Sequence, residues 1–155
     1  MDHAITIKSP VGPLTITARD GAIVALDFGA GGASRPRSPL LAEAKAQLAA
    51  YFSGRLRTFT LPLAPHGTSF QCRVWAAMQT IPFGRTATYG ELADRLRSSA
   101  RAVGGACGRN PIPIIIPCHR VLARHGPGGY SGAGGLRTKR ALLGGEGVTL
   151  GGRPL

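Results

Sequence analysis

The chain has few cysteines, few acidic residues and no long apolar run. Cys72, Cys107 and Cys118 are its only cysteines, and their odd number and spacing fit neither a zinc site nor a disulfide framework. No apolar stretch approaches the roughly 20 residues that a membrane-spanning helix needs, and the first residues lack the basic start and apolar segment of a signal peptide. We therefore expect a soluble protein of a reducing compartment, without a membrane partner. Such a protein is cytoplasmic in a bacterium or archaeon and nuclear in a eukaryote.

Acidic residues are scarcest in the second half of the chain. The whole chain has 19 Lys+Arg against 7 Asp+Glu, a net charge of +12. Residues 1–66 hold seven basic and four acidic residues, a net +3, whereas residues 67–155 hold twelve and three, a net +9. This balance favours a polyanion such as the nucleic-acid backbone as partner. A genome rich in G and C, which favours arginine codons, explains part of the basic excess but not the shortage of acids after residue 66.

Apolar periodicity predicts an α+β fold in two parts. Alternating apolar and polar residues predict antiparallel strands at 3–8, 13–18 and 22–28, and helical spacing predicts a helix at 40–52 that Ser53-Gly54 ends. We expect an exposed loop between the third strand and this helix. Residues 1–66 therefore form a small N-terminal lobe of strands plus one helix, and residues 67–155 form a second, mostly helical domain.

Capping signals place the helices of the second domain. Thr68 with Gln71 and Thr88 with Glu91 match the capping box, so helices are expected from about 69 until shortly before Pro82, and at 89–96. Ser98 or Ser99 caps a third helix at 100–107, and a last helix at 136–143 is expected to stop at two glycines, 144 and 145. Two short helices joined by a tight turn predict a helix-turn-helix unit.

The most reactive pair of side chains is Cys118 with His119, at the end of a proline-rich apolar run. A thiolate is a strong nucleophile at neutral pH, and an imidazole can take its proton. Prolines at 111, 113 and 117 predict that the run is extended. Because adjacent side chains diverge, we expect a bridging water between thiol and imidazole, with a carboxylate orienting the imidazole from behind. The alternative is a buried structural cysteine beside a chance histidine.

The helix expected at 100–107 contains two consecutive glycines. Gly104 and Gly105 cost it roughly 1 kcal/mol each relative to alanine, which suggests a close approach to another molecule. A bare helix can enter a narrow groove, and Arg101 at its start can wedge into a base stack. The alternative is tight packing between two helices.

These motifs together resemble the O6-alkylguanine-DNA alkyltransferase family. The matching stretches follow the family's order at 70–75, 81–86, 88–93, 101–106, 110–111, 117–121 and 130–132, and the likeness is weak over the first fifty residues. The resemblance implies a ribonuclease-H-like N-terminal lobe. It also implies a suicidal methylated-DNA–protein-cysteine S-methyltransferase that moves methyl or other alkyl groups from O6-alkylguanine in DNA onto Cys118, once per molecule. O4-alkylthymine is a further candidate substrate.

The resemblance assigns catalytic roles to four residues. Cys118 is the acceptor, His119 keeps it as a thiolate through water, and Glu146, the only acid after Asp94, orients the histidine. Tyr89 pushes the phosphate of the target nucleotide and donates a proton to the leaving guanine. Taken without the resemblance, Tyr89 is equally an aromatic core residue and Glu146 a solvated tail residue.

The resemblance also implies how DNA is bound. The partner is double-stranded DNA containing O6-alkylguanine, entered from the minor groove with the damaged base flipped out, and the protein acts as a monomer. Arg101 fills the gap that the flipped nucleotide leaves. The DNA-binding set is Arg101, Ala102, Gly104, Gly105, Tyr89 and Arg109. The base pocket is Tyr130, Ser131, Asn110 and Val121, and the loop after Tyr130 is longer than the family pattern.

No metal or cofactor is expected. Some family members bind zinc through N-terminal cysteines and histidines, but no cysteine precedes Cys72 here. We expect Cys72 and Cys107 to be structural, and the histidines at 3, 66 and 125 to be exposed. The alternatives to alkyl transfer are a non-catalytic lesion-binding protein, a cysteine hydrolase and a transcriptional regulator. Cys118 argues against the first, the charge and the glycine helix against the second, and the lack of an extra domain against the third.

Overall fold

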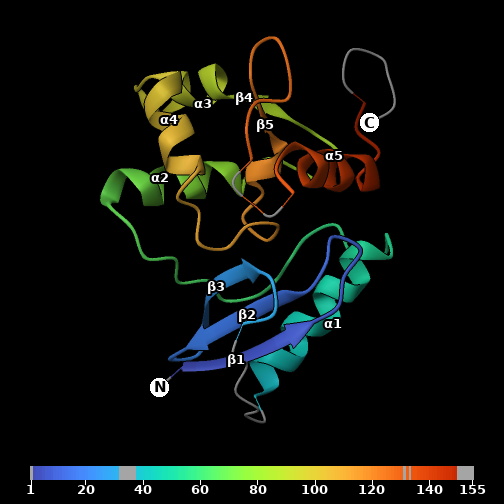
Figure 1. The fold of residues 1–155 in the computed structure, drawn as a ribbon. Coiled ribbons are helices and arrows are strands. Elements are labelled where there is room, and N and C mark those ends of the chain that lie inside the picture. The colour runs from blue at the N-terminus through green and yellow to red at the C-terminus, as the bar shows by residue number, and fades with distance from the viewer. Residues whose placement is uncertain (1, 32–37, 131, 133, 150–155) are drawn as a thin grey trace.

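The computed structural model describes residues 2–31, 38–130, 132 and 134–149. The N-terminal sheet and its helix form one lobe, and a mostly helical lobe lies against it (Figure 1). Buried apolar side chains of both lobes join in one continuous core. The predicted α+β class, with antiparallel strands first and helices after, is confirmed.

The N-terminal sheet is a three-stranded antiparallel meander. It consists of β1 (Asp2–Ile7), β2 (Leu14–Arg19) and β3 (Ala22–Phe28), in that order. Each strand begins within one residue of the prediction. The turn from β2 to β3 uses Asp20 and Gly21, both with positive φ, which suits a tight hairpin turn.

Helix α1 (Pro39–Phe52) packs on one face of this sheet (Figure 1). It begins where the Ser38 hydroxyl accepts the Leu41 N–H, and proline at the first helical position suits this start. Its buried side recurs at helical spacing and consists of Leu41, Ala44, Gln47, Leu48 and Tyr51. Tyr51, at the end of this stripe, reaches the second lobe.

The second lobe begins with α2 (Ser69–Met78), followed by α3 (Tyr89–Leu96) and α4 (Ala100–Cys107). Both predicted capping boxes form, and Ser99 caps α4 by accepting the Ala102 N–H. Arg97 adopts a left-handed conformation, φ 54°, that turns the chain from α3 into α4. The indole N–H of Trp75 in α2 donates to the Ala106 carbonyl at 2.9 Å, which fixes α4 against α2.

The segment from Asn110 to Pro117 is not extended, so that prediction is wrong. Ile114 has φ +74°, and the Ile116 N–H donates back to the Ile112 carbonyl at 2.9 Å, which makes a tight turn. The Asn110 side chain closes it, donating to the Ile116 carbonyl and accepting the Ile112 N–H, each at 2.9 Å. Proline fixes its own φ and restricts the residue before it, so the three prolines exclude a helix here. Ile114 is neither a proline nor followed by one, and so it is free to turn.

A short 3-10 helix, η1 (Cys118–Arg120), follows this turn, so Cys118 and His119 are not on a strand. The chain continues into β5 (Val121–Leu122), which pairs in parallel with β4 (Ala87–Thr88). This pairing joins the active-site segment to the start of α3. The Leu26 N–H of β3 also donates to the Pro111 carbonyl at 2.9 Å, which ties the N-terminal lobe to the same segment.

Helix α5 (Leu136–Gly145) runs two residues further than predicted. Gly144 and Gly145 do not stop it, because buried Leu142 and Leu143 anchor its last turn and both carbonyls accept the Glu146 N–H. Packing therefore offsets the helix cost of the two glycines. Within the described residues, no helix is both long and apolar enough to cross a membrane.

Candidate active site

The Cys118 side chain lines a cavity of about 380 Å³. The cavity lies between α3, α4, η1 and the loop that precedes α5. The residues that line it are Tyr89, Gly104, Cys107, Gly108, Cys118, Gly129 and Tyr130. The fold thus brings Cys118 together with residues from three predicted sets, namely Tyr89 of the catalytic set, Gly104 of the DNA-binding set and Tyr130 of the base pocket. It adds Cys107, Gly108 and Gly129, which were in none of these sets.

Cys118 is 5% exposed, and its surroundings act on its charge in opposite directions. Burial raises the pKa of the thiol, whereas the Asn110 side chain and the positive charge of Lys139 lower it. A thiol in this position holds its proton until a nearby base removes it. A base close to Cys118 is therefore required for nucleophilic chemistry.

His119 is fully buried and forms a short hydrogen bond with Glu146, 2.6 Å from Nε2 to Oε2. Burial lowers the pKa of His119, although Glu146 raises it in part. Burial also raises the pKa of Glu146, but hydrogen bonds from His119, Arg120 and Tyr51 outweigh this and bring it to about 2. Glu146 is thus an ionised acceptor and not a solvated tail residue.

This pairing decides which imidazole nitrogen carries the proton. A carboxylate only accepts, so Nε2 of His119 must be the donor, and Nδ1 of a neutral ring keeps its lone pair. Nδ1 is buried and makes no hydrogen bond with any protein group in the described part of the chain. The His119 ring can therefore accept a proton on Nδ1 while Nε2 stays bonded to Glu146.

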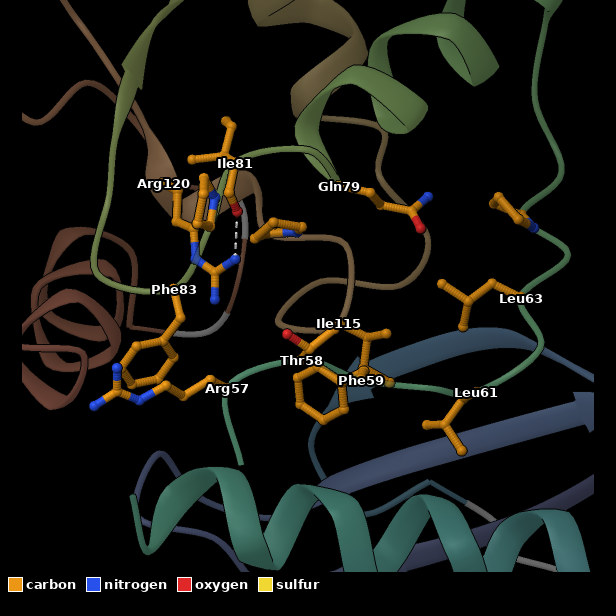
Figure 2. Close-up of a pocket in the computed structure, with 13 residues that line it drawn as sticks. Arg57, Thr58, Phe59, Leu61, Leu63, Gln79, Ile81, Phe83, Ile115 and Arg120 are labelled. Carbon is orange, nitrogen blue, oxygen red and sulfur yellow. Dashed lines mark hydrogen bonds between the residues drawn. The ribbon is translucent and has the colours of Figure 1, made fainter. Parts of the chain in front are cut away.

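Arg120 and Tyr51 complete the surroundings of Glu146, and the sequence reasoning selected neither. Arg120 donates from Nε to Oε1 at 2.8 Å and from Nη2 to Oε2 at 3.1 Å. Its Nη1 donates to the Ile81 carbonyl at 2.7 Å (Figure 2). Tyr51 donates its hydroxyl to Oε2 at 2.6 Å from the other lobe. Arg120 directly follows the Cys-His pair, which was the one available signal for it.

Two tyrosines flank the cavity. Burial, followed by the neighbouring Cys107 and Cys118, raises the pKa of Tyr89 to about 12, so its hydroxyl keeps its proton at neutral pH. A Cβ on Gly128 would lie 2.9 Å from the Tyr89 ring, so glycine is needed there, and its φ is +73°. The Tyr130 hydroxyl is buried without a hydrogen-bond partner among the described residues. The predicted pocket residue Ser131 lies outside the described residues.

Lys139 of α5 is a site residue that the sequence reasoning missed. It is fully buried, and its Nζ donates to the Val121 carbonyl at 2.6 Å and to the Gly129 carbonyl at 3.0 Å. Burial lowers its pKa to about 8, although Cys118 and Cys107 raise it. A lysine in a helix usually faces solvent. Lys139, however, is three and four residues before Leu142 and Leu143, and this spacing puts it on the apolar side of α5.

The remaining predicted pocket residues support the site from outside the cavity. Val121 is fully buried in β5, and Asn110 braces the turn before Cys118; neither is among the residues that line the cavity. Cys107 is buried with its Sγ 3.4 Å from the Met78 Sδ, as expected of a structural cysteine, yet it also lines the cavity. Cys72, in the first turn of α2, is only half-buried and packs against the outside of the core. Its predicted place in the core is therefore confirmed only in part.

Helix α4 presents a bare face to solvent. Arg101, Gly105 and the following Arg109 are exposed, Ala102 and Gly104 are half-buried, and the opposite side of the helix is buried. A Cβ on Gly105 would meet nothing within 4 Å, and one on Gly104 would only touch the Tyr89 ring at 4.0 Å. Packing within the protein therefore does not require these glycines.

No group of three or more His, Cys, Asp or Glu that could hold a metal gathers among the described residues. Of the three histidines outside the site, His66 and His125 are exposed, as predicted, whereas His3 is half-buried in β1.

Both lobes match the same protein family. Residues 3–65 match the profile of the "6-O-methylguanine DNA methyltransferase, ribonuclease-like domain", and residues 69–148 match that of the "DNA binding domain" of the same proteins. A methylated-DNA–protein-cysteine methyltransferase of Mycobacterium tuberculosis is 45% identical over 152 residues, which is 92% of this chain and 91% of the relative. One of Methanosarcina barkeri is 45% identical over 148 residues, 88% of this chain and 92% of the relative.

Solved structures agree with these matches. The crystal structure of the Mycobacterium tuberculosis protein OGT in complex with DNA superposes with a TM-score of 0.82 and 46% identity, covering 93% of this chain and 92% of that one. A structure of the Mycobacterium tuberculosis O6-methylguanine methyltransferase gives the same TM-score at 44% identity, covering 94% and 93%.

Proposed function

Because the chain belongs to the 6-O-methylguanine DNA methyltransferase family, and so repairs DNA by transferring alkyl groups from O6-alkylguanine to a cysteine of its own, we propose that Cys118 is that cysteine. One observation carries the proposal. Cys118 lines the cavity, and the next residue is a histidine that a buried carboxylate orients. Cys72 is partly buried in the first turn of α2 and does not line this cavity, and Cys107 has a methionine sulfur as its neighbour.

The site supports a displacement in which the thiol is first deprotonated. His119, through a bridging water, takes the Cys118 proton on Nδ1, and Glu146 stabilises the imidazolium that results. The thiolate attacks the alkyl carbon, a C–S bond forms as the C–O6 bond breaks, and the electron pair leaves with guanine. Tyr89, protonated at neutral pH, donates a proton to the leaving base and regains one from solvent. The thioether product is stable, so each molecule acts once.

The cavity suits a flipped base. A guanine O6 inside a duplex is out of reach of a thiolate, so the damaged nucleotide must leave the stack. The Tyr130 hydroxyl, buried and without a hydrogen-bond partner among the described residues, supplies a polar contact for the base. We assign Ser131, the next residue in the sequence, to the same contact with the base. Asn110 and Val121 support the pocket, since one braces the turn before Cys118 and the other receives the Lys139 hydrogen bond.

The exposed face of α4 is the surface that we assign to the minor groove. Arg101 at its start fills the gap left by the flipped nucleotide, and Ala102, Gly104 and Gly105 let the helix approach the groove floor closely. Arg109 contacts the backbone at the other end of the helix. The crystal structure of the mycobacterial relative in complex with DNA supports DNA as the partner. We further infer that the protein binds as a monomer and that its domains divide near residues 66 and 67.

Stoichiometry tests the proposal. Limiting protein is incubated with excess duplex that carries O6-methylguanine with a labelled methyl group. One methyl per protein molecule is expected, with no further turnover and no effect of a chelator. Cys118→Ala is expected to accept none while still binding the duplex. Continuous release of methanol would show a hydrolase instead, and duplex binding by the wild type without transfer would show a lesion-binding protein.

A further inference from the structure

The N-terminal lobe contributes one side chain to the buried network around the active-site histidine. We propose that Tyr51 is a positioning residue for alkyl transfer, whose hydroxyl holds the Glu146 carboxylate in the orientation that His119 requires. The proposal rests on the roles proposed above for Cys118 and His119. It gives the N-terminal lobe, whose sequence shows no catalytic motif, a defined part in the chemistry.

The geometry of Glu146 carries the argument. The Tyr51 hydroxyl and Nε2 of His119 both lie 2.6 Å from the same oxygen, Oε2. The other oxygen, Oε1, accepts from Nε of Arg120 at 2.8 Å and from the Gly84 N–H at 3.2 Å. A carboxylate offers about four acceptor positions. Nη2 of Arg120 also donates to Oε2, at the longer distance of 3.1 Å, so the five donors occupy every position. The Tyr51 hydroxyl and Nε2 of His119 make the two shortest of these bonds, and together they fix the orientation of Oε2.

Tyr51 is itself held rigidly. Its ring packs against three phenylalanines, with ring centroids 5.2 Å from Phe52, 5.4 Å from Phe59 and 6.1 Å from Phe83. Phe83 projects from the loop after α2, with the Arg57 guanidinium 5.3 Å and the Arg120 guanidinium 5.9 Å from its ring centroid. Figure 2 shows Phe83 between these two arginines, beside a cavity of about 310 Å³ at the junction of the lobes.

The ring and the hydroxyl of Tyr51 have different roles: the ring packs in the aromatic cluster, and the hydroxyl bonds to Glu146. A phenylalanine would make the same aromatic contacts, so packing alone does not require tyrosine. Burial, with the negative charge of Glu146, raises the pKa of Tyr51, so the hydroxyl remains a donor throughout the neutral range. Among the described residues, the hydroxyl's hydrogen-bond partner is the carboxylate that orients the histidine.

The hydroxyl also adjusts the basicity of His119. By donating to Oε2, it offsets part of the negative charge of Glu146, which would otherwise stabilise the imidazolium form of His119. The other charged or titratable groups that act on this network are Arg120 and Lys139, which lower the pKa of His119, and Tyr130, which raises the pKa of Tyr51. Loss of the hydroxyl leaves more charge on Oε2, so the pKa of His119 rises. A histidine that keeps its proton to higher pH accepts the thiol proton only at higher pH.

Tyr51→Phe tests this inference in the full-length protein. Transfer from a free O6-substituted guanine base is measured from pH 5 to 9. The expected maximal rate is about tenfold lower, as for loss of one hydrogen bond to a charged group, and the acid limb moves to higher pH by about half a unit. The nitrogen resonances of His119 in NMR spectra are expected to titrate with the same shift. The methyl group is still expected on Cys118, so this result and the test of the acceptor are independent.

Phe59→Leu is the matched control, because it loosens the packing around Tyr51 and leaves the hydroxyl in place. It is expected to lower the melting temperature and to leave both titration midpoints unchanged. An unshifted acid limb and an unshifted His119 titration in Tyr51→Phe would overturn the inference, even if the rate fell.

A second measurement uses the unaltered protein and does not depend on how any variant folds. The hydroxyl proton of Tyr51 is expected as a downfield NMR resonance that exchanges slowly with water and moves as His119 titrates. A Tyr51 hydroxyl that exchanges freely with water would overturn the inference.

Discussion

The buried ammonium of Lys139 donates a 2.6 Å hydrogen bond to the backbone carbonyl of Val121, three residues after Cys118. A second bond, 3.0 Å to the Gly129 carbonyl, joins α5 to the opposite side of the cavity. Lys139 therefore holds two walls of the site together. It also places a positive charge near Cys118, which lowers the pKa of the thiol.

Replacing Lys139 with methionine is expected to slow alkyl transfer at neutral pH by roughly tenfold, as expected for a pKa change of about one unit. Without the ammonium, the pKa of Cys118 rises, so the rate recovers as the pH is raised. The measurement is a pH profile of transfer from a free O6-substituted guanine. Arg140→Met, an exposed neighbour on the same helix, serves as control. Equal profiles for wild type and Lys139→Met would show that the buried charge does not act on the thiol.

Gly105→Ala is expected to have opposite effects on the stability of the folded protein and on DNA binding. The added methyl group meets no neighbour within 4 Å, so the free energy of unfolding should increase by up to about 1 kcal/mol. Repair of duplex DNA should nevertheless slow, because the methyl group stands on the face assigned to the minor groove. Gly145→Ala in α5, equally open, is expected to change stability without affecting repair. Unchanged duplex affinity in Gly105→Ala would remove α4 from the interface.

Arg101→Ala is expected to slow repair of a lesion in duplex DNA far more than reaction with a free O6-substituted guanine. The duplex reaction includes an unstacking cost of a few kcal/mol, on the order of that for other flipped bases, which the free base does not bear. Single-turnover rates with both substrates measure the difference. Arg140→Ala carries the same charge change on α5 and should reduce neither rate strongly. Equal losses in both assays would mean that Arg101 supports the fold or the pocket.

Glu146→Gln should make stability less dependent on pH in acid. The pKa of Glu146 falls from 4.5 to about 2 on folding, so the ionised form stabilises the native state above pH 4.5 and this contribution is lost as the pH falls toward 2. At pH 7 the variant should unfold more easily by about 3 kcal/mol, since it leaves buried Arg120 without its charged partner. Urea titrations from pH 7 to pH 3 should show the two proteins converging. A constant difference across this range would contradict the pKa assigned to Glu146.

Local signals in the sequence predicted much of the fold correctly. The capping boxes at Thr68 and Thr88 define helix starts through contacts three residues apart, and the starts of α2 and α3 followed from them. The antiparallel strands followed from alternation alone. The turn at Ile114 was missed because it depends on the Asn110 side chain, which bonds across six residues to the Ile116 carbonyl.

The candidate site was predictable only where its residues lie close in sequence or match a known pattern. Cys118 and His119 are adjacent, and Glu146 was the only acid available in its region. Tyr51 is 95 residues from Glu146 in sequence, so its contact arises only when the two lobes pack together. Lys139 looked like a surface residue because of its charge, although its spacing from Leu142 and Leu143 put it on the apolar side of the helix. Its two backbone carbonyl partners, in contrast, follow from no sequence pattern.

The position of the transferred methyl group decides whether Cys118 is the acceptor, because Cys107 and Cys118 line the same cavity. The protein is incubated with duplex DNA containing deuterated O6-methylguanine and then fragmented for mass spectrometry. We predict one deuterated methyl group per molecule, located on Cys118, with Cys72 and Cys107 unmodified. A methyl group on Cys107, or on any residue other than Cys118, would contradict it.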